Sequence, residues 1–169
     1  MTIQEAIHTA IGYETKVHEV YRGTLDKIQD PAGKHIFQVL ADEEKGHLDY
    51  LNHKIEQLRQ TGAVSAGPLA TAVPARDKLA AAAKAFQQKI ARVDSSSDLK
   101  LLQQALDVEL ETSRFYAGVL GQLPPEGQQF FARFVEIEEG HVAIVQAQID
   151  HISQTGFWFD CLEVDFDAE

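Results

Sequence analysis

The sequence predicts an all-α fold, a four-helix bundle in which two repeated antiparallel helical hairpins are joined by a long crossover that contains an extra helix. Three observations support this prediction. Apolar residues recur every three or four positions over long stretches, which is the period of an amphipathic helix. No segment before residue 157 alternates apolar and polar residues as a strand does. The chain also contains an internal repeat, which would let one hairpin pack against the other.

Residues 2–62 should form the first hairpin. A capping box at Thr2 starts its first helix, and the apolar period of that helix continues as far as Ile28. Asp30 followed by a proline is a typical start for the second helix, which ends at Gly62. Because the turn between the two helices is short, they should be antiparallel neighbours.

Residues 63–97 should form the crossover. Its first part is rich in glycine, alanine and proline without a strong period, so we expect an irregular connection there. From Leu79 to Val93 the apolar residues are spaced by three or four positions, which predicts an extra helix with one apolar face. A connection of this length can run along the whole bundle.

Residues 98–156 should form the second hairpin. The segment Ser95-Ser96-Ser97-Asp98 is expected to cap its first helix, and Gly156 should end its second. Residues 157–169 form an aromatic and acidic tail, which we expect to dock on this bundle or on a partner subunit, since it would otherwise expose an apolar patch. We therefore expect a homo-oligomer, in which the long crossover would also allow subunits to exchange hairpins.

The composition disfavours or excludes several classes of protein. The 169 residues, 44% of them hydrophobic, suffice for one core, and the formal net charge of -11 disfavours nucleic acids and anionic membranes as partners. The single cysteine, Cys161, excludes an intramolecular disulfide and a thiolate metal cluster. We find no targeting segment and no run of about 18 apolar residues, so we expect a soluble cytoplasmic protein.

The repeat brings the same residue types to corresponding places in the two hairpins. A shift of 95 positions for the first helix and of 94 for the second superposes Glu14 on Glu109, Tyr21 on Tyr116, Glu44 on Glu138 and His47 on His141. Each glutamate lies in a column of apolar residues spaced by seven, which drifts by only about 20° per heptad. Each histidine follows its glutamate by three residues and therefore shares its helix face. The pattern predicts four glutamates and two histidines inside the bundle.

This cluster predicts a dinuclear metal centre. Unpaired buried carboxylates cost several kcal/mol each, and no lysine or arginine recurs beside them. Two divalent cations would balance the four negative charges. Carboxylate and imidazole ligands suit iron, manganese or zinc, and four glutamates with two Glu-x-x-His pairs are the pattern of di-iron and di-manganese carboxylate bundles. We therefore expect two iron ions, with manganese or zinc as alternatives, held by Glu14, Glu44, His47, Glu109, Glu138 and His141.

Three further groups of residues belong to this hypothesis. Tyr21 and Tyr116 lie two turns from the glutamates, where they either pack in the core or donate hydrogen bonds to the carboxylates, with a one-electron role as a further alternative. Glu43 could replace Glu44 because it also shares the face of a histidine, but its repeat partner is an isoleucine. The glycines between the ligands, Gly46 and Gly140, predict the close approach of a neighbouring backbone.

These motifs carry a family resemblance. Glu14 with Tyr21, Glu44-Lys45-Gly46-His47, Glu109 with Phe115-Tyr116, and Glu138-Glu139-Gly140-His141 resemble the rubrerythrin branch of the ferritin-like superfamily over all four long helices. The resemblance implies a ferritin-like bundle with a non-haem di-iron centre, an oxidoreductase that handles peroxide, dioxygen or ferrous iron in oxidative stress or iron homeostasis.

The chain departs from that family in two respects. It lacks the four-cysteine rubredoxin module, so electrons would come from a separate donor or from ferrous iron. Thr112 stands where the family has a further glutamate, which favours a ferroxidase or a simple iron-handling role over a rubrerythrin-type peroxidase. Two alternatives stay open: an iron-binding or storage protein of the ferritin kind, and a non-catalytic helical module whose site is empty or holds zinc.

Overall fold

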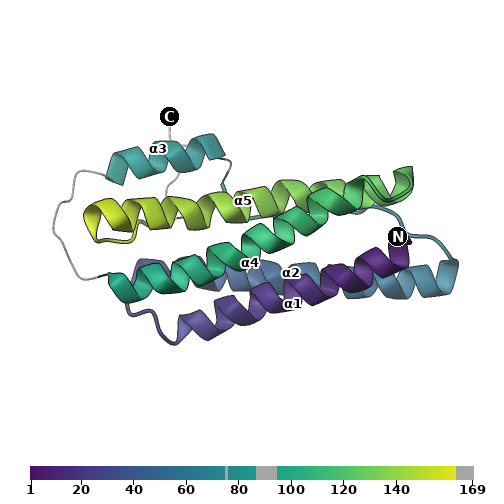
Figure 1. The fold of residues 1–169 in the computed structure, drawn as a ribbon, viewed down its shortest axis with the longest axis horizontal. Helices are drawn as coiled ribbons and strands as arrows, with labels where there is room; N and C mark the ends of the chain where they lie inside the picture. Colours follow the sequence, from purple (N-terminus) through teal and green to yellow (C-terminus); the bar gives the residue numbers. More distant parts are fainter. Residues whose placement is uncertain (75, 87–94, 163–169) are drawn as a thin grey trace.

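The computed structural model describes residues 1–74, 76–86 and 95–162, with the side chains of residues 76 and 83–86 left out. This part of the chain forms five α-helices and no strand (Figure 1). The helices are α1 (Ile3–Leu25), α2 (Pro31–Thr61), α3 (Arg76–Phe86), α4 (Ser96–Leu120) and α5 (Pro125–Thr155). The prediction of an all-α fold is confirmed.

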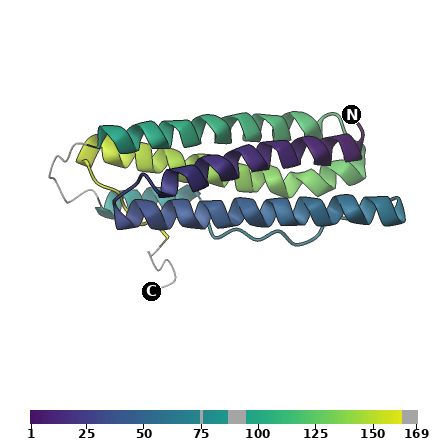
Figure 2. The ribbon, with the colours of Figure 1, turned by 90° about the horizontal axis from the view of Figure 1, so that it is seen from below.

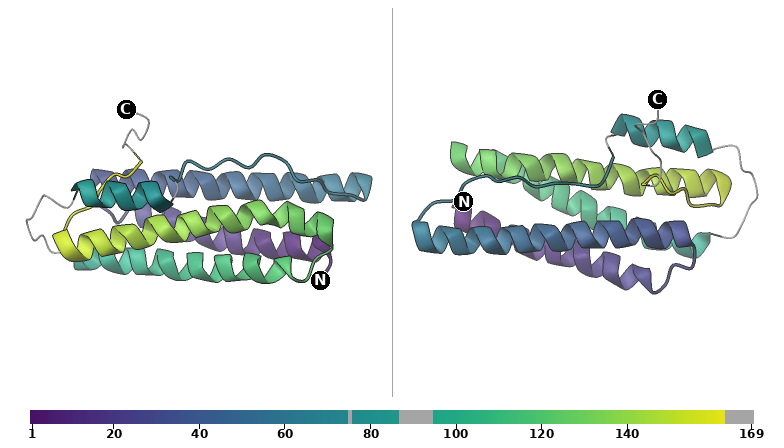
Figure 3. Two further views of the ribbon diagram at one scale, coloured as in Figure 1. Left: turned by 90° about the horizontal axis from the view of Figure 1, so that it is seen from above. Right: turned by 180° about the vertical axis from the view of Figure 1, so that it is seen from behind.

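The four long helices lie side by side as two antiparallel hairpins. α1 packs along α2, α4 packs along α5, and α1 also contacts α4 (Figures 1 and 2). The short helix α3 lies outside this group and packs on α5 (Figure 3). The inner faces of the two hairpins bury each other, since each apolar cluster combines residues of both. The molecule is therefore a helical bundle with one added helix.

Local sequence signals explain where the helices of the first hairpin begin and end. Thr2 and Glu5 form the expected capping box, with backbone-to-side-chain bonds of 2.8 and 3.2 Å. Asp30 accepts the N–H groups at the start of α2, and Gly62 ends that helix with a φ of 72°. Gly156 ends α5 in the same way, with a φ of 81°.

One expected cap is absent. Ser95 precedes α4 but makes no side-chain capping bond, and Asp98 instead accepts a hydrogen bond of 2.8 Å from the indole Nε1–H of Trp158. The tail segment therefore uses the carboxylate that the sequence assigned to helix capping. Trp158 reaches Asp98 because residues 157–162 return to the start of α4.

The first part of the crossover is an extended strip along the bundle, as Figures 2 and 3 show. Tyr50 Oη accepts the backbone N–H of Gly67 at 2.9 Å, and Lys54 Nζ donates to the carbonyl of Ser65 at 2.7 Å. Farther along, Arg133 Nε of α5 donates to the carbonyl of Leu69 at 3.1 Å. The strip is therefore held by both hairpins.

The predicted extra helix is present in part. α3 covers the beginning of the predicted apolar stripe, and Leu79 is only 2% exposed. The end of the stripe, Ile90 and Val93, lies outside the described residues. None of the described helices combines the length and the apolar character that a membrane span requires.

The tail segment 157–162 packs on the bundle. Trp158 covers Gly33, where an added Cβ would lie 2.7 Å from the indole ring, and Gln148 Nε2 donates to the carbonyl of Phe159 at 2.8 Å. Cys161 is fully buried, and burial beside Asp160 raises the pKa of its thiol to about 12. Residues 163–169 lie outside the described part of the chain.

The core is divided along the bundle axis. One apolar cluster contains Tyr21, Phe37 and Ile152, and a second contains Ile7, Leu51 and Phe131. Along each long helix the predicted ligands fall between the residues of these two clusters. The glutamates and histidines therefore form a polar layer between two apolar regions.

Candidate metal centre

The structure brings all six predicted ligands together. α1 contributes Glu14, α2 contributes Glu44 and His47, α4 contributes Glu109, and α5 contributes Glu138 and His141. Each of these residues is at most 1% exposed. Four helices therefore meet at one buried cluster of carboxylates and imidazoles.

The six residues form two overlapping groups that could each hold a metal ion. One group is Glu14, Glu44, His47 and Glu138, and the other is Glu44, Glu109, Glu138 and His141. Each residue of a group offers one ligand atom, and the four ligand atoms of a group all lie within 4.8 Å of one another. Glu44 and Glu138 belong to both groups, so their carboxylates could bridge two ions.

The histidines face the cluster through the same ring nitrogen. His47 Nδ1 lies 3.1 Å from Glu14 Oε2, 3.3 Å from Glu44 Oε2 and 3.7 Å from Glu138 Oε1. His141 Nδ1 lies 2.8 Å from Glu44 Oε1 and 3.7 Å from Glu109 Oε1. The two rings are nearly parallel, with centroids 5.6 Å apart. The repeat in the sequence thus produces two matching half-sites.

The polar atoms of this cluster are poorly satisfied by protein groups. Both oxygens of Glu44 and of Glu138, one oxygen of Glu109, and one nitrogen of each histidine are buried without a hydrogen-bond partner among the described residues. Native proteins rarely leave buried polar atoms unpaired, because each costs about 1–3 kcal/mol. A pair of cations would satisfy the carboxylate oxygens and His141 Nδ1, although not His47 Nε2, which lies on the outer side of its ring, so the residues present fit a dinuclear metal centre.

In the metal-free protein, protons partly replace the cations. Burial and the neighbouring carboxylate of Glu14 raise the pKa values of Glu44 and Glu138 well above the ordinary value. Burial opposes the charge on His47, but its hydrogen bonds and ion pairs with Glu14 and Glu44 raise its pKa to about 10. Metal binding must therefore displace protons from the cluster.

The two tyrosines connect the hairpins to each other. Tyr21 of α1 donates its hydroxyl hydrogen to Glu109 of α4, and Tyr116 of α4 donates to Glu14 of α1. Both phenols are fully buried, and burial together with these carboxylates raises their pKa values well above 10.0. The sequence spacing related each tyrosine to the glutamate of its own helix, whereas each bonds the glutamate of the other hairpin.

Glu43 has a role that the sequence did not predict. Its carboxylate belongs to neither ligand group and lies 2.9 Å from His141 Nε2. Burial opposes its charge, but the hydrogen bonds from His141, Ala72 and Thr71 lower the pKa of Glu43 below the ordinary value. The repeat could not show this contact, because Ile137 stands at the corresponding place.

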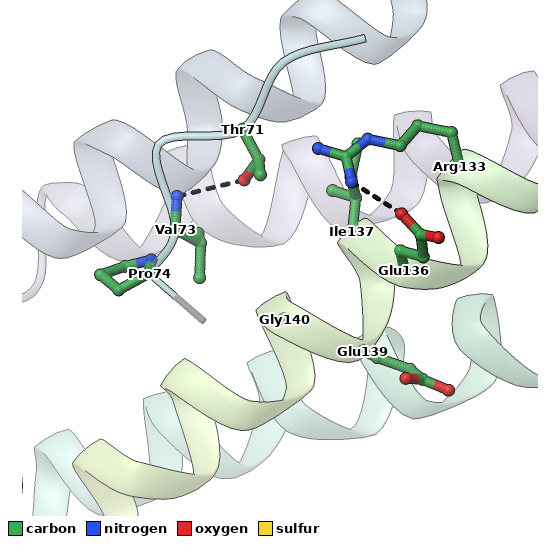
Figure 4. A pocket seen from close by; sticks show the side chains of 8 residues that line it. All are labelled: Thr71, Val73, Pro74, Arg133, Glu136, Ile137, Glu139 and Gly140. Carbon is green, nitrogen blue, oxygen red and sulfur yellow. Dashed lines mark hydrogen bonds and ion pairs between the residues drawn. The ribbon is translucent and has the colours of Figure 1, made fainter. Parts of the chain in front are cut away.

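A cavity of about 250 Å³ lies between the crossover and α5 (Figure 4). Its walls include Thr71 and Val73 from the crossover and Ile137 and Gly140 from α5. Arg133 crosses one end and pairs with Glu136 at 2.8 Å, while the side chain of Glu139 points away from the crossover in Figure 4. The acidic residues at this cavity therefore do not converge on a common point.

The expectation for the two glycines was wrong. An added Cβ at Gly46 would meet nothing within 4 Å, and at Gly140 it would meet only a side-chain methyl of Val73, at 3.6 Å. No neighbouring backbone requires either glycine among the described residues. The structure therefore supplies no packing reason for Gly46.

Thr112 adds no ligand to the cluster. It is fully buried, and its Oγ1 donates to the carbonyl of Val108 in its own helix at 3.0 Å. The neighbouring Glu111 is exposed and pairs with Lys16. The centre therefore has four glutamates and two histidines among the described residues.

The comparisons with known proteins assign no family to this centre: the chain matches no family model, no curated protein and no solved structure.

Proposed function

We propose that the protein is a non-haem di-iron oxidoreductase with a ferritin-like bundle, which reduces peroxide or dioxygen, oxidises ferrous iron, or does both. The observation that carries this proposal is the pair of four-residue ligand groups that share Glu44 and Glu138. The carboxylate oxygens and the His141 Nδ1 that are buried without hydrogen-bond partners support the binding of two cations.

The donor set favours iron, with manganese and zinc as alternatives. Calcium and magnesium prefer oxygen ligands alone, whereas a mixture of carboxylate and imidazole suits the first-row transition metals. Two ferrous ions would add four positive charges to four carboxylates and would supply the two electrons that reduce one peroxide to water. The only cysteine, Cys161, is buried away from the ligands, so further electrons would come from a separate donor or from more ferrous iron.

The residues around the ligands keep the centre ordered and dry. The phenols of Tyr21 and Tyr116 each hold one terminal carboxylate by a hydrogen bond. Phe134 covers the ring of His47 at a centroid distance of 5.5 Å. Because apolar side chains lie on both sides of the layer, charges inside it interact more strongly than they would in water.

Thr112 favours the oxidation of ferrous iron over a rubrerythrin-type peroxidase. Its hydroxyl is already bonded within its helix, so it adds no carboxylate to the four glutamates and two histidines. Those six residues form the two groups that could each hold an ion.

The test begins with metal content and continues with kinetics. Purified protein should bind two ferrous ions per chain under anaerobic conditions, and rapid mixing with dioxygen or with peroxide should oxidise both. Glu138→Gln should lose both ions, whereas Glu139→Gln, which removes the next carboxylate from the exposed surface, should behave as wild type. Equal iron binding by these two variants would contradict the proposal. Uptake far beyond two irons would indicate storage, and selective retention of zinc would indicate a structural site.

A further inference from the structure

The two half-sites differ on the outer side of each histidine. The outer nitrogen of His141 lies 2.9 Å from Glu43 Oε2 and donates a hydrogen bond to it. The outer nitrogen of His47 is buried without a hydrogen-bond partner among the described residues, and its ring meets Phe134 at an interplanar angle of 71°. The difference arises because Ile137, which is 2% exposed, replaces Glu43 in the second hairpin.

Glu43 is itself held by the crossover. Its carboxylate accepts hydrogen bonds from Thr71 Oγ1, at 2.8 Å, and from the backbone N–H of Ala72. Thr71 Oγ1 also accepts the N–H of Val73 at 3.1 Å, a bond drawn in Figure 4. The Glu43 side chain is only 10% exposed. Hydrogen bonds therefore run without a break from the crossover through Glu43 to His141.

This connection affects how His141 can bind a cation. A carboxylate on the outer nitrogen keeps the proton there, so the lone pair of Nδ1 points into the cluster. It also fixes the orientation of the ring and increases its basicity as a ligand. His47 has the same position relative to its glutamates, but no carboxylate accepts a hydrogen bond from its outer nitrogen among the described residues. The half-site of His141 is therefore better prepared for a metal ion.

We propose that Glu43 is a positioning residue that makes the two metal positions unequal, so that the position at Glu109 and His141 binds its cation more tightly and fills first. This inference rests on the metal centre proposed above. It adds an order of filling, and it gives the crossover a part in setting the affinity of one position.

The test is a titration of the metal-free full-length protein with Co²⁺, followed by visible absorption in competition with a chelator. The wild type should bind two ions in two unequal steps. Glu43→Gln should weaken the tighter step by about 10- to 100-fold, as loss of an outer hydrogen-bond partner does at other metal sites, and should leave the weaker step unchanged. Thr71→Val should act in the same direction by a smaller factor.

Two controls assign the effect to one position. Glu139→Gln removes an equal charge from the exposed surface of α5 and should change neither step. Glu43→Gln should retain its effect in a His47→Gln background and lose it in a His141→Gln background. Far-UV circular dichroism of each metal-free variant checks that the helices are retained.

The outcomes separate the two proposals. Equal steps in the wild type, or an effect of Glu43→Gln that persists without His141, would overturn the role of Glu43 while leaving the metal centre intact. A wild type that binds no Co²⁺ would overturn the metal centre and this inference together.

Discussion

The two hairpins are alike where they face each other and different where they face outward. On the inner side, each provides two glutamates, one histidine and one tyrosine, and the tyrosine hydrogen bonds are reciprocal. On the outer side, α5 carries α3, while the crossover binds α2 through Glu43 and Tyr50. The repeat therefore determines which buried glutamates and histidines meet, whereas segments outside the repeat determine the surroundings of each one.

The largest effects should come from the carboxylates shared by both half-sites. Glu44→Gln or Glu138→Gln should abolish the binding of both metal ions, because each residue belongs to both ligand groups. Glu14→Gln or Glu109→Gln should reduce the stoichiometry to one ion, because each belongs to a single group. Metal content after equilibrium dialysis measures this difference, and identical stoichiometries in all four variants would contradict the shared role.

Metal removal should destabilise both hairpins together. A ligand at about 1,000 times its dissociation constant stabilises the folded state by about 4 kcal/mol, which for a chain of this size raises the Tm by roughly 10 °C. Removal of the metal by a chelator should therefore lower the Tm by roughly 10 °C, and addition of the metal should restore the Tm. An unchanged melting curve after verified removal of metal would show that the carboxylates do not depend on cations.

The metal-free protein should lose stability as the pH rises above 6.5. The pKa of His47 is raised from 6.5 to about 10, so the folded protein holds a proton that the unfolded chain has released. The raised pKa values of Glu44 and Glu138 act in the same direction. Urea denaturation at pH 6.5, 8 and 9.5 should show this decline in metal-free protein and a much smaller one in metal-loaded protein. If the metal-free protein were more stable at pH 9.5 than at pH 6.5, the prediction would be wrong.

The two tyrosines offer the sharpest test of the inner symmetry. Tyr21→Phe and Tyr116→Phe each remove one hydrogen bond to a buried carboxylate, so each should destabilise the metal-loaded protein by about 1–3 kcal/mol. Denaturant unfolding with metal present measures both values. A large effect for only one tyrosine would mean that the two half-sites are unequal on their inner side as well.

The smallest effect should come from a substitution of Gly46 in the first hairpin. Gly46→Ala should stabilise the protein by up to about 1 kcal/mol, because alanine favours a helix interior and an added Cβ meets nothing within 4 Å. Thermal unfolding measures the change. If Gly46→Ala instead lowered the stability of the protein, Gly46 would have a conformational role in α2.

The sequence predicted the buried glutamates and histidines well because they repeat. Glu14 and Glu109 could be recognised as a pair, and the columns of apolar residues placed both in the interior. The sequence could not predict the partner of Glu43, because that contact joins α2 to α5 and to an irregular strip, and periodicity describes only one helix at a time. The role of Asp98 was missed for the same reason, since its partner Trp158 lies in a segment outside the repeat.

The polar layer also fixes how far each helix can slide along its neighbours. A shift of one helical turn, about 5.4 Å, would carry a glutamate out of the layer and into one of the two apolar clusters. Its charge would then be buried without a partner, while the layer would lose one of its ligands. A single polar residue in a coiled coil selects one axial alignment in the same way. In this bundle each of the four long helices has such a buried polar residue, so the layer proposed to bind metal also sets the register of the fold.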